Sequence, residues 1–341
     1  MELTTPSASQ GRTSTLGSTL GNYAGLLAAL VLMILLFSWK SQYFMTANTF
    51  LTIANDIPAV LVTSVGMTFV LIIGGIDLSV GSVMALAAAV AGIAMMQWHW
   101  PLALAMLVAV AVGMVAGLLN GAISVAWTLP SFIVTLGMLE VARGSAYIAT
   151  NSRTQYIGGP VEWLSLPTKF GLAPAFVIAL VIVVAAQLVL TRTVYGRYLI
   201  GIGTNEEAMR LAGVDPRPIK ISVFAIAGLL AGLAGIMQCS RLEAADPNAG
   251  IGTELVVIAA VVIGGTSLMG GRGSVVNTFF GVLIISVLEA GLAQVGASEP
   301  VKRVVTGGVI VAAVVLDAWR HQLAGAGLLR RLFSRPEPQN P

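Results

Sequence analysis

Charged residues are scarce in this chain of 341 residues: Asp, Glu, Lys and Arg together make up 10%, while hydrophobic residues make up 57%. Soluble domains average about 25% charged residues. This shortage excludes a soluble globular domain, because too few ionisable groups remain to cover its surface. It also excludes a disordered chain, which needs many charged and polar residues. The composition therefore indicates an integral membrane protein.

Cysteine, histidine and lysine are rare as well. Cys239 is the only cysteine, so no disulfide can form within the chain. His99 and His321 fall at the edge of an apolar segment and in the C-terminal tail, which excludes a histidine-based metal site or a Ser–His pair in the membrane. None of the four lysines follows a glycine, so the chain lacks a P-loop for ATP. The absences argue against an enzyme, a metal site and a cofactor on this chain, and the net charge of +3 gives no sign of nucleic-acid binding.

Long apolar segments are what the chain has instead. Leu78–Leu139 contains 62 residues without one Asp, Glu, Lys or Arg, and as a helix it would measure roughly 93 Å, about three crossings of a bilayer core. Tryptophan and proline divide it at Gln97–Pro101 and at Trp127–Ser131, as expected at membrane interfaces. The runs do not alternate as barrel strands do, so we predict an all-α bundle. Its ten expected spans are 22–39, 52–73, 78–96, 102–126, 132–150, 171–191, 221–240, 254–269, 274–294 and 304–319.

The distribution of basic residues predicts the orientation. With the N-terminus inside, the expected inner segments hold eleven Lys and Arg residues and the outer loops hold six. The positive-inside rule then places both termini in the cytoplasm. We accordingly expect a cytoplasmic tail at 1–21, a transmembrane domain at 22–319 and a second cytoplasmic tail at 320–341. No small-residue cleavage site follows 22–39, so this segment is expected to remain as the first span.

Two glycine-rich segments resemble each other. Ile73–Gly81 and Ile263–Gly271 match at five of nine positions. On the expected topology they lie six spans apart, whereas an inverted repeat needs an odd offset. Either the span count is wrong or the match is a coincidence of glycine-rich sequence, and we favour coincidence.

The longest charged segment between expected spans is the cytoplasmic loop Arg192–Lys220. Inside it, Asn205–Gly213 predicts one short helix with a polar N-cap, acids at its positive start, a base near its end and a glycine stop. The residues concerned are Asn205, Glu206, Glu207, Arg210 and Gly213, and Ala208, Leu211 and Ala212 form a small apolar face. Such a helix could insert into a groove on a cytosolic partner. It could equally be a connector on the membrane surface.

Four blocks of the sequence resemble permease subunits of ATP-driven importers for ribose and related simple sugars. They are GGIDLSVGS at 74–82, PSFIVTLGM at 130–138, GRYLIGIGTNEEAMRLAGV at 196–214 followed by LLAGLAGI at 229–236, and GTELVVIAAVVIGGTSLMGGRGS at 252–274. The likeness covers roughly residues 45–320, in the same order and spacing. Together the blocks are specific, whereas any one glycine cluster alone would be weak.

The resemblance implies partners that composition does not show. It implies a multi-pass permease of the bacterial inner membrane that works with a second permease subunit, a cytosolic ABC ATPase and a periplasmic sugar-binding protein. ATP and Mg²⁺ would be bound by the ATPase and not by this chain. The loop 192–220 would then be a coupling loop. Its residues that would engage the ATPase are Asn205, Glu206, Glu207, Ala208, Arg210, Leu211 and Gly213.

Polar residues in or near the spans are candidates for a sugar pathway, because a neutral sugar needs hydrogen-bond partners. These candidates are Asn55, Asp77, Ser79, Asn120, Ser131 and Thr135. Asp77 and Ser79 could instead cap the span that they begin, and Asn120 could join two helices. Glu140 and Arg143, three residues apart, are expected to neutralise each other. In the outer loop 241–253, Glu243 and Asp246 are candidate contacts for the binding protein.

Two other functional classes remain open on the residues alone. An ion-driven secondary transporter would need titratable groups facing a cavity, for which Asp56 and Glu289 are available, and it would work without an ATPase. A membrane scaffold would carry no flux at all. The sequence favours the importer permease, because the capped helix at 205–213 has no purpose in the secondary transporter. The identity of the sugar is not predicted.

Overall fold

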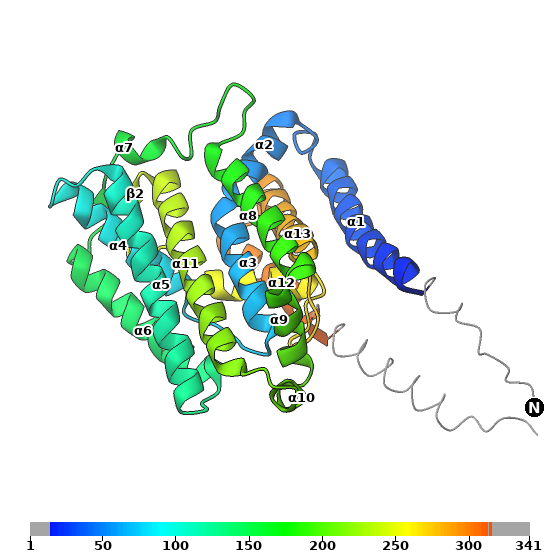
Figure 1. Ribbon diagram of the computed structural model, residues 1–341. Coiled ribbons are helices and arrows are strands. Elements are labelled where there is room, and N and C mark those ends of the chain that lie inside the picture. Colours follow the sequence, from blue (N-terminus) through cyan, green and yellow to red (C-terminus); the bar gives the residue numbers. More distant parts are fainter. Residues whose placement is uncertain (1–13, 313, 316–341) are drawn as a thin grey trace, which may run out of the picture.

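The computed structural model describes residues 14–312, 314 and 315, which form a bundle of helices (Figure 1). The helices are α1 (Ser14–Lys40), α2 (Ala47–Asp56), α3 (Pro58–Ile72), α4 (Val80–Met96), α5 (Leu102–Ala126), α6 (Ser131–Thr150), α7 (Gly159–Glu162), α8 (Pro174–Arg192), α9 (Val194–Thr204), α10 (Glu206–Leu211), α11 (Pro216–Leu242), α12 (Thr253–Ile263) and α13 (Val275–Gln294). Residues 299–312 are helical too. The strands β1 (Gln155–Tyr156) and β2 (Ala244–Ala245) form one antiparallel pair.

Five helices of the described chain are long and apolar enough to cross a membrane: α5, α6, α8, α11 and α13. The pair α2 and α3 passes the same test as one broken span bent by 51°. Pro58 stands at the start of α3, where it lacks the amide proton that a continuous helix would need. The prediction of a helical, multi-span membrane protein is confirmed in this form. The expected spans 102–126, 132–150, 171–191, 221–240 and 274–294 each agree with a helix to within five residues at both ends.

Three expected spans correspond to shorter apolar helices: α1 from Ala24, α4 and α12. The expected span 254–269 is wrong as a continuous helix, because α12 ends at Ile263 and residues 264–274 are not helical. Its 11 residues give about 16 Å, roughly half of a bilayer core. Gly265 has a φ of +85°, a conformation that interrupts the helix at little steric cost. The expected span 304–319 begins within the helix at 299–312, and its end lies outside the described residues.

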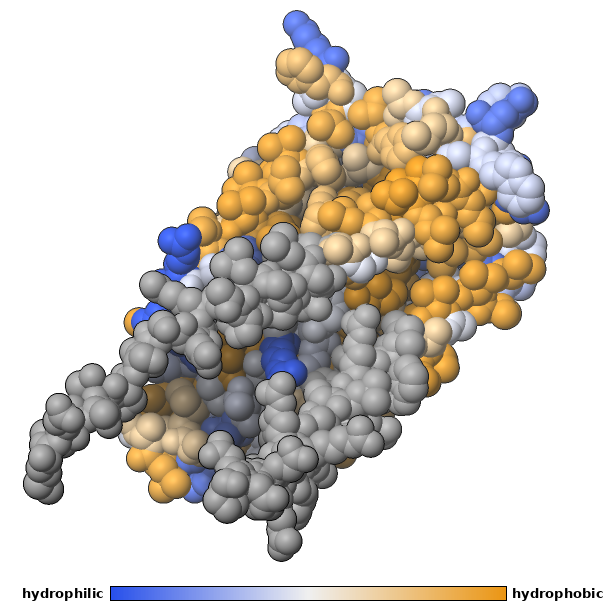
Figure 2. All heavy atoms as spheres, turned by 90° about the vertical axis from the view of Figure 1, so that its right-hand side faces the viewer, coloured by the Kyte–Doolittle hydropathy of each residue, from blue (hydrophilic) through white to orange (hydrophobic). Residues whose placement is uncertain are grey.

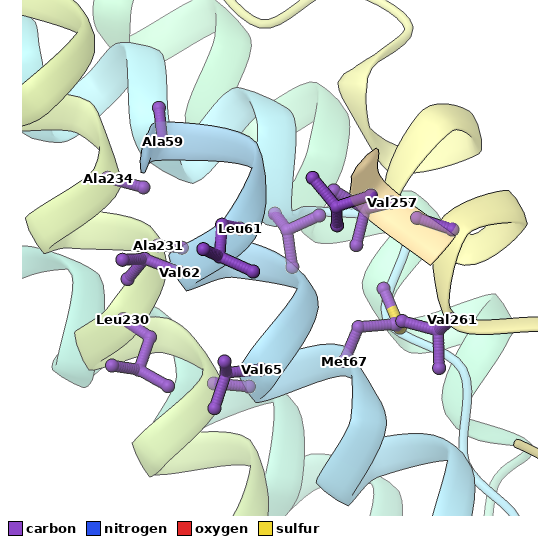
Figure 3. Close-up of a cluster of buried hydrophobic side chains, with 14 of the residues drawn as sticks. Ala59, Leu61, Val62, Val65, Met67, Leu230, Ala231, Ala234, Val257 and Val261 are labelled. Atoms are coloured by element: carbon purple, nitrogen blue, oxygen red, sulfur yellow. The ribbon is translucent and has the colours of Figure 1, made fainter. Parts of the chain in front are cut away.

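Helix α3 occupies the centre of the core, with all of its residues buried except one. Figure 3 shows its side chains between α11 on one side and α12 on the other. The residues labelled there are Ala59, Leu61, Val62, Val65 and Met67 of α3, Leu230, Ala231 and Ala234 of α11, and Val257 and Val261 of α12. Two broken or short helices, α3 and α12, therefore share the interior of the protein.

Glycines bring α5 and α11 into backbone contact. A Cβ atom added to Gly117 of α5 would overlap the carbonyl group of Phe224 on α11, and one added to Gly113 would overlap the carbonyl group of Gly228. One turn further along α5, a Cβ on Gly121 would lie 2.9 Å from the Cα atom of Ile221. Small residues every four positions allow this close approach, which stabilises helix pairs in lipid. These glycines therefore serve helix packing.

The two ends of the bundle differ. The strand pair β1–β2 and helix α7 lie at one end, and α10 lies at the other (Figure 1). The sides in between are apolar, and Figure 2 shows the side that carries α1 as predominantly orange, with most blue residues toward its edges. This arrangement matches a bilayer around the middle, with α10 on the side that the charge distribution predicts to be cytoplasmic.

Candidate coupling and translocation site

Helix α10 is capped as its sequence predicts. The Oδ1 atom of Asn205 accepts a hydrogen bond from the backbone N–H of Ala208 at 2.9 Å. At the other end Gly213 has a φ of +84°, the left-handed conformation that glycine adopts readily. The prediction of one short helix within 205–213 is thus confirmed, with the caps in place. The caps allow six residues to hold a helical turn that packing alone would not support.

The charged residues of α10 form a small network. Arg210 makes ion pairs with Glu207 at 3.2 Å and with Glu206 at 3.7 Å. Lys220 of α11 donates to Glu206 at 2.9 Å, which ties α10 to the start of the following helix. All these side chains are exposed or half-exposed, so each pair contributes little to stability on its own. The network fixes the direction of the helix.

The apolar face of α10 points away from the protein. Leu211 is 82% exposed, and Ala208 and Ala212 are exposed as well. An exposed leucine on a rigid, capped helix can insert into an apolar groove of another protein. Within the described chain nothing covers this face.

The end of α3 and the loop 264–274, which joins α12 to α13, meet the junction between α9 and α10. A Cβ atom on Gly203, near the end of α9, would overlap the carbonyl group of Ile72 and the amide group of Gly271. The amide of Gly271 also donates to the carbonyl oxygen of Ile72 at 2.8 Å. The two similar segments, 73–81 and 263–271, are therefore in contact beside this junction. The backbone at the end of α9 therefore contacts the end of α3 and the loop that follows α12.

The non-helical loop 73–79 between α3 and α4 is held by side chains of α6. The backbone N–H of Ile76 donates to the Oγ atom of Ser131 at 2.9 Å, and that of Leu78 donates to the Oγ1 atom of Thr135 at 3.0 Å. Loop backbone buried in a membrane protein needs such partners, because lipid offers none. Two of the six pathway candidates thus contact the backbone of this loop.

Three more candidates meet at the same place. Asp77, buried, accepts hydrogen bonds from the N–H and the hydroxyl of Ser79 at 2.9 and 2.6 Å. Asn120 of α5 donates to the Oγ atom of Ser79 at 2.9 Å. Ser79 is the N-cap of α4, but its own side chain does not accept from the helix. Asp77, Ser79, Asn120, Ser131 and Thr135 therefore form one buried cluster around loop 73–79.

Asn55 does not join this cluster. Its side-chain amide donates to the carbonyl oxygen of Gly171 at 2.9 Å and accepts from the N–H of Ala173 at 2.8 Å. These contacts lie at the end of α2 and just before α8. The amide ties the bend between α2 and α3 to the start of α8.

Both acids proposed as binding-protein contacts hold the loop that follows α11. The Glu243 carboxylate accepts a hydrogen bond from the hydroxyl of Tyr156 at 3.1 Å. This bond raises the pKa of the Tyr156 hydroxyl, so the group stays protonated at neutral pH. Asp246 accepts from the backbone N–H and the side-chain amide of Asn248 at 2.9 and 3.1 Å.

Arg143 makes contacts that the sequence did not indicate. Its guanidinium donates to the carbonyl oxygens of Pro247 and Ala249 at 2.5 and 2.8 Å. Among the described residues no ion pair within 4 Å joins it to Glu140, although the charge of Glu140 does act on it, so the expected neutralisation is present only as a longer-range interaction. The two carbonyl partners lie more than 100 residues further along the chain. The i, i+3 spacing within α6 could not predict them. The mid-span position of Arg143 was the one signal in the sequence.

An apolar groove of about 420 Å³ lies between α5 and α11. It is lined by Met114, Leu118, Pro218, Ile221, Ser222, Ala225, Ile226 and Leu229. Ser222 supplies the one polar side chain of this lining, and its hydroxyl already bonds to Tyr195 and to the carbonyl oxygen of Ile219. A sugar that entered this groove would lose its hydrogen bonds to water and would find no equivalent partners in the lining.

Comparison with known proteins now bears on this geometry. A family described as "Branched-chain amino acid transport system / permease component" matches residues 49–314. The chain belongs to this permease family. Among curated relatives, the ribose import permease protein RbsC of Escherichia coli strain K12 is 38% identical over 302 residues, which cover 85% of this chain and 92% of the relative.

Two further relatives are named for other sugars. The D-allose transport system permease protein AlsC of Escherichia coli strain K12 is 34% identical, covering 82% of this chain and 86% of its own. The fructose import permease protein FrcC of Rhizobium meliloti is 32% identical, covering 82% of this chain and 81% of its own. No solved structure matches. The resemblance stated from the four sequence blocks is confirmed, and this permease is a transport component, not an enzyme.

Proposed function

We propose that this permease is the membrane-spanning subunit of an ATP-binding-cassette importer for a monosaccharide, a ribose-like pentose or a hexose. A periplasmic binding protein delivers the sugar, and a separate cytosolic ATPase, which binds ATP and Mg²⁺, supplies the energy. The relatives named for ribose, allose and fructose support the sugar class. The observation that carries the proposal is the capped helix α10 with its exposed Leu211.

Helix α10 is the contact with the ATPase. Asn205 and Gly213 set its ends, Glu206, Glu207 and Arg210 set its charge, and Ala208 and Leu211 enter the groove of the partner. Movement of the ATPase then passes through Gly203 to the end of α3 and the loop that follows α12. Since α3 is separated from α2 by the bend at Pro58 and α12 ends at Ile263, each can shift without unfolding a continuous span.

The membrane arrangement follows the distribution of bases. Ten segments cross or enter the bilayer: α1, the pair α2–α3, α4, α5, α6, α8, α11, α12, α13 and the helix that begins at 299. Both termini lie in the cytoplasm, and the membrane is the bacterial inner membrane. Two permease chains stand side by side, each with its own α10.

The buried cluster around loop 73–79 acts in transport by holding this loop. Asp77, Ser79 and Asn120 hydrogen-bond to one another, although the buried Oδ1 atom of Asn120 has no partner in the described chain, and Ser131 and Thr135 bond to the loop backbone. Asn55 likewise uses its side-chain amide to hold the backbone before α8 at the bend after α2. These six residues shape the pathway and do not themselves touch the sugar. At the outer end, Glu243 and Asp246 shape the surface on which the binding protein sits.

The substrate class is tested by reconstitution. The permease is purified with its ATPase subunit, placed in lipid vesicles with ATP, and supplied with candidate binding proteins and a panel of labelled pentoses and hexoses. We expect uptake of at least one sugar of the panel. Absence of ATP-dependent uptake across the panel, with an assembled and ATP-hydrolysing complex, would contradict the sugar assignment.

A further inference from the structure

Helix α6 exposes one charged side chain, Glu140, among apolar ones such as Leu136, Val141 and Ile148. The exposed large side chains of α1, α5 and α8 are aliphatic over their middle turns, as expected against lipid: Leu32, Leu35, Leu107, Val115, Val181 and Val184 are examples. On α6 the middle turns expose Glu140 between Gly137 and Val141. In Figure 1 this helix lies at the edge of the bundle opposite α1.

Glu140 lies at the depth of the bilayer centre. It is the tenth of the 20 residues of α6, about 14 Å from either end of the helix. A charged side chain at that depth costs about 2.5–3.5 kcal/mol if lipid surrounds it. No hydrogen bond or ion pair to this carboxylate forms within the described part of the chain, since Arg143 donates to Pro247 and Ala249 instead. Apart from the charge of Arg143 on the same helix, water or a polar solute is what can stabilise this carboxylate.

The loop 246–252 beside α6 descends into the membrane. Ala245 contacts α4 at Gly92, near the outer end of that helix, whereas Gly250 contacts Gly81, near its start. Gly81 and Gly92 are about 16 Å apart along α4, and residues 247–250 pass along this stretch in turns. The chain thus runs down α4 before α12 begins.

Polar groups of this loop face the same side as α6. Asn248 is exposed, and its Oδ1 atom accepts from the hydroxyl of Tyr147 at 2.8 Å, one turn beyond Arg143 on α6. Irregular backbone at membrane depth occurs where protein buries it or where it lines a water-filled space. The exposure of Asn248 and Glu140 selects the second possibility for this surface.

The surroundings of Glu140 leave room for a ligand. Gly137 and Gly144 flank it one turn below and one turn above, and a Cβ added to either would meet no atom within 4 Å. A carboxylate can accept hydrogen bonds from two neighbouring hydroxyl groups, which is the pattern that a sugar ring offers.

We propose that the exposed face of α6 with the descending loop 246–252 lines the path of the sugar, and that Glu140 hydrogen-bonds its hydroxyl groups at mid-membrane. The inference rests on the proposed function and deepens it. The same face of the second permease chain stands across the path and separates it from lipid. Glu140 is thereby a specificity-determining residue for neutral polyhydroxy solutes.

Cysteine labelling tests whether the face is aqueous. Cys239, the only cysteine, is buried and is replaced by alanine, and single cysteines are introduced as Glu140→Cys, Gly144→Cys and, on α8, Val181→Cys as a matched mid-span control. The assembled importer in vesicles is treated with a charged, membrane-impermeant methanethiosulfonate. We expect the two α6 sites to react about tenfold faster or more than Val181→Cys, which faces lipid. Equal rates at all three sites would overturn the proposal.

Uptake by Glu140 variants tests the contact with the sugar. Glu140→Leu is expected to lower uptake at subsaturating sugar about tenfold or more, because the hydrogen bonds from the carboxylate to the solute are lost, while Glu140→Gln keeps one acceptor oxygen and loses less. Co-purification of the ATPase with both variants, at matched permease yields, shows that the complex still assembles. Wild-type uptake in Glu140→Leu would overturn the contact. If the wild-type importer moves no sugar, the proposed function fails, whereas the labelling rates still test the aqueous face.

Discussion

Thr135 is a buried residue whose hydroxyl serves a segment outside its own helix. It accepts the N–H of Leu78 in the loop 73–79, which no other group of the described chain satisfies. Thr150, on the same helix and equally buried, only donates to the carbonyl oxygen of Ala146 one turn back. Loss of the Thr135 hydroxyl would leave the Leu78 amide without a partner, whereas loss of the Thr150 hydroxyl would leave no backbone amide unpaired.

We expect Thr135→Val to destabilise the permease by about 1–3 kcal/mol, the cost of an unsatisfied buried amide. Thr150→Val should cost less than about 1 kcal/mol, since the Ala146 carbonyl keeps its helical hydrogen bond. Thermal unfolding of the two purified variants, followed by tryptophan fluorescence in the same detergent, measures the difference. Equal shifts of Tm for both would show that the loop contact has no special weight.

Gly117 is a position where a side chain has no room. A Cβ there overlaps the Phe224 carbonyl group, so Gly117→Val must push α5 and α11 apart. We expect a loss of folded protein, seen as a smaller monodisperse fraction in size-exclusion chromatography. Gly25→Val on α1, where nothing lies within 4 Å, is the matched control and should leave that fraction unchanged. Wild-type yield from both variants would contradict the packing account.

The sequence singled out the residues of the buried cluster but not their partners. Asn120, Ser131 and Thr135 are polar residues in or beside apolar segments, and this alone marks them. Their contacts with residues 76–79 lie more than 40 positions away, and only the folded bundle brings them together. The partners of Arg143 could not be predicted for the same reason. They are carbonyl groups of the loop 246–252, which is distant from Arg143 in the sequence.

Among whole elements, α10 was the most predictable. Its caps are local, so Asn205 and Gly213 determine its ends without help from the rest of the chain. Helix α12 was the least predictable. Its sequence stays apolar up to residue 269, so hydropathy predicts a longer span, whereas the helix ends at Ile263. The bend between α2 and α3 had a local signal in Pro58.

Replacing the exposed leucine of α10 tests this element. Leu211→Asp puts a charge on the face proposed to enter the ATPase, so we expect the affinity for the ATPase subunit to fall about tenfold or more. Phe170→Asp, at the opposite end of the bundle and 88% exposed, is the control with the same change of chemistry. Co-purification of the ATPase with each variant, at matched permease yields, measures the effect. Unchanged capture by Leu211→Asp would remove α10 from the interface.

The junction at Gly203 tests how movement passes inward. Gly203→Val separates the end of α9 from the Ile72 carbonyl group and the Gly271 amide group. We expect the ATPase still to bind and hydrolyse ATP while sugar uptake per ATP falls several-fold, because the path to α3 and α12 is disturbed. Parallel assays of hydrolysis and uptake in one vesicle preparation check it. A proportional loss of both activities would indicate a folding defect instead.

On the scale of the whole molecule, scarcity of charge predicts a helical membrane protein, and the distribution of charge predicts where it meets its partners. Residues 78–139 carry no formal charge, while the loop 192–220 holds eight charged residues and contains α10. The family match over 49–314 covers both of these parts of the chain. What composition could not show is that the core is built around two broken helices.

The central claim is that ATP hydrolysed on another chain drives a sugar through this permease. Vesicles holding the permease, its ATPase and ATP inside, with binding protein and labelled sugar outside, measure it directly when a proton ionophore is added. The account predicts uptake that persists with the ionophore and stops without ATP. Uptake that survives ATP depletion and collapses with the ionophore would contradict it and favour an ion-driven transporter.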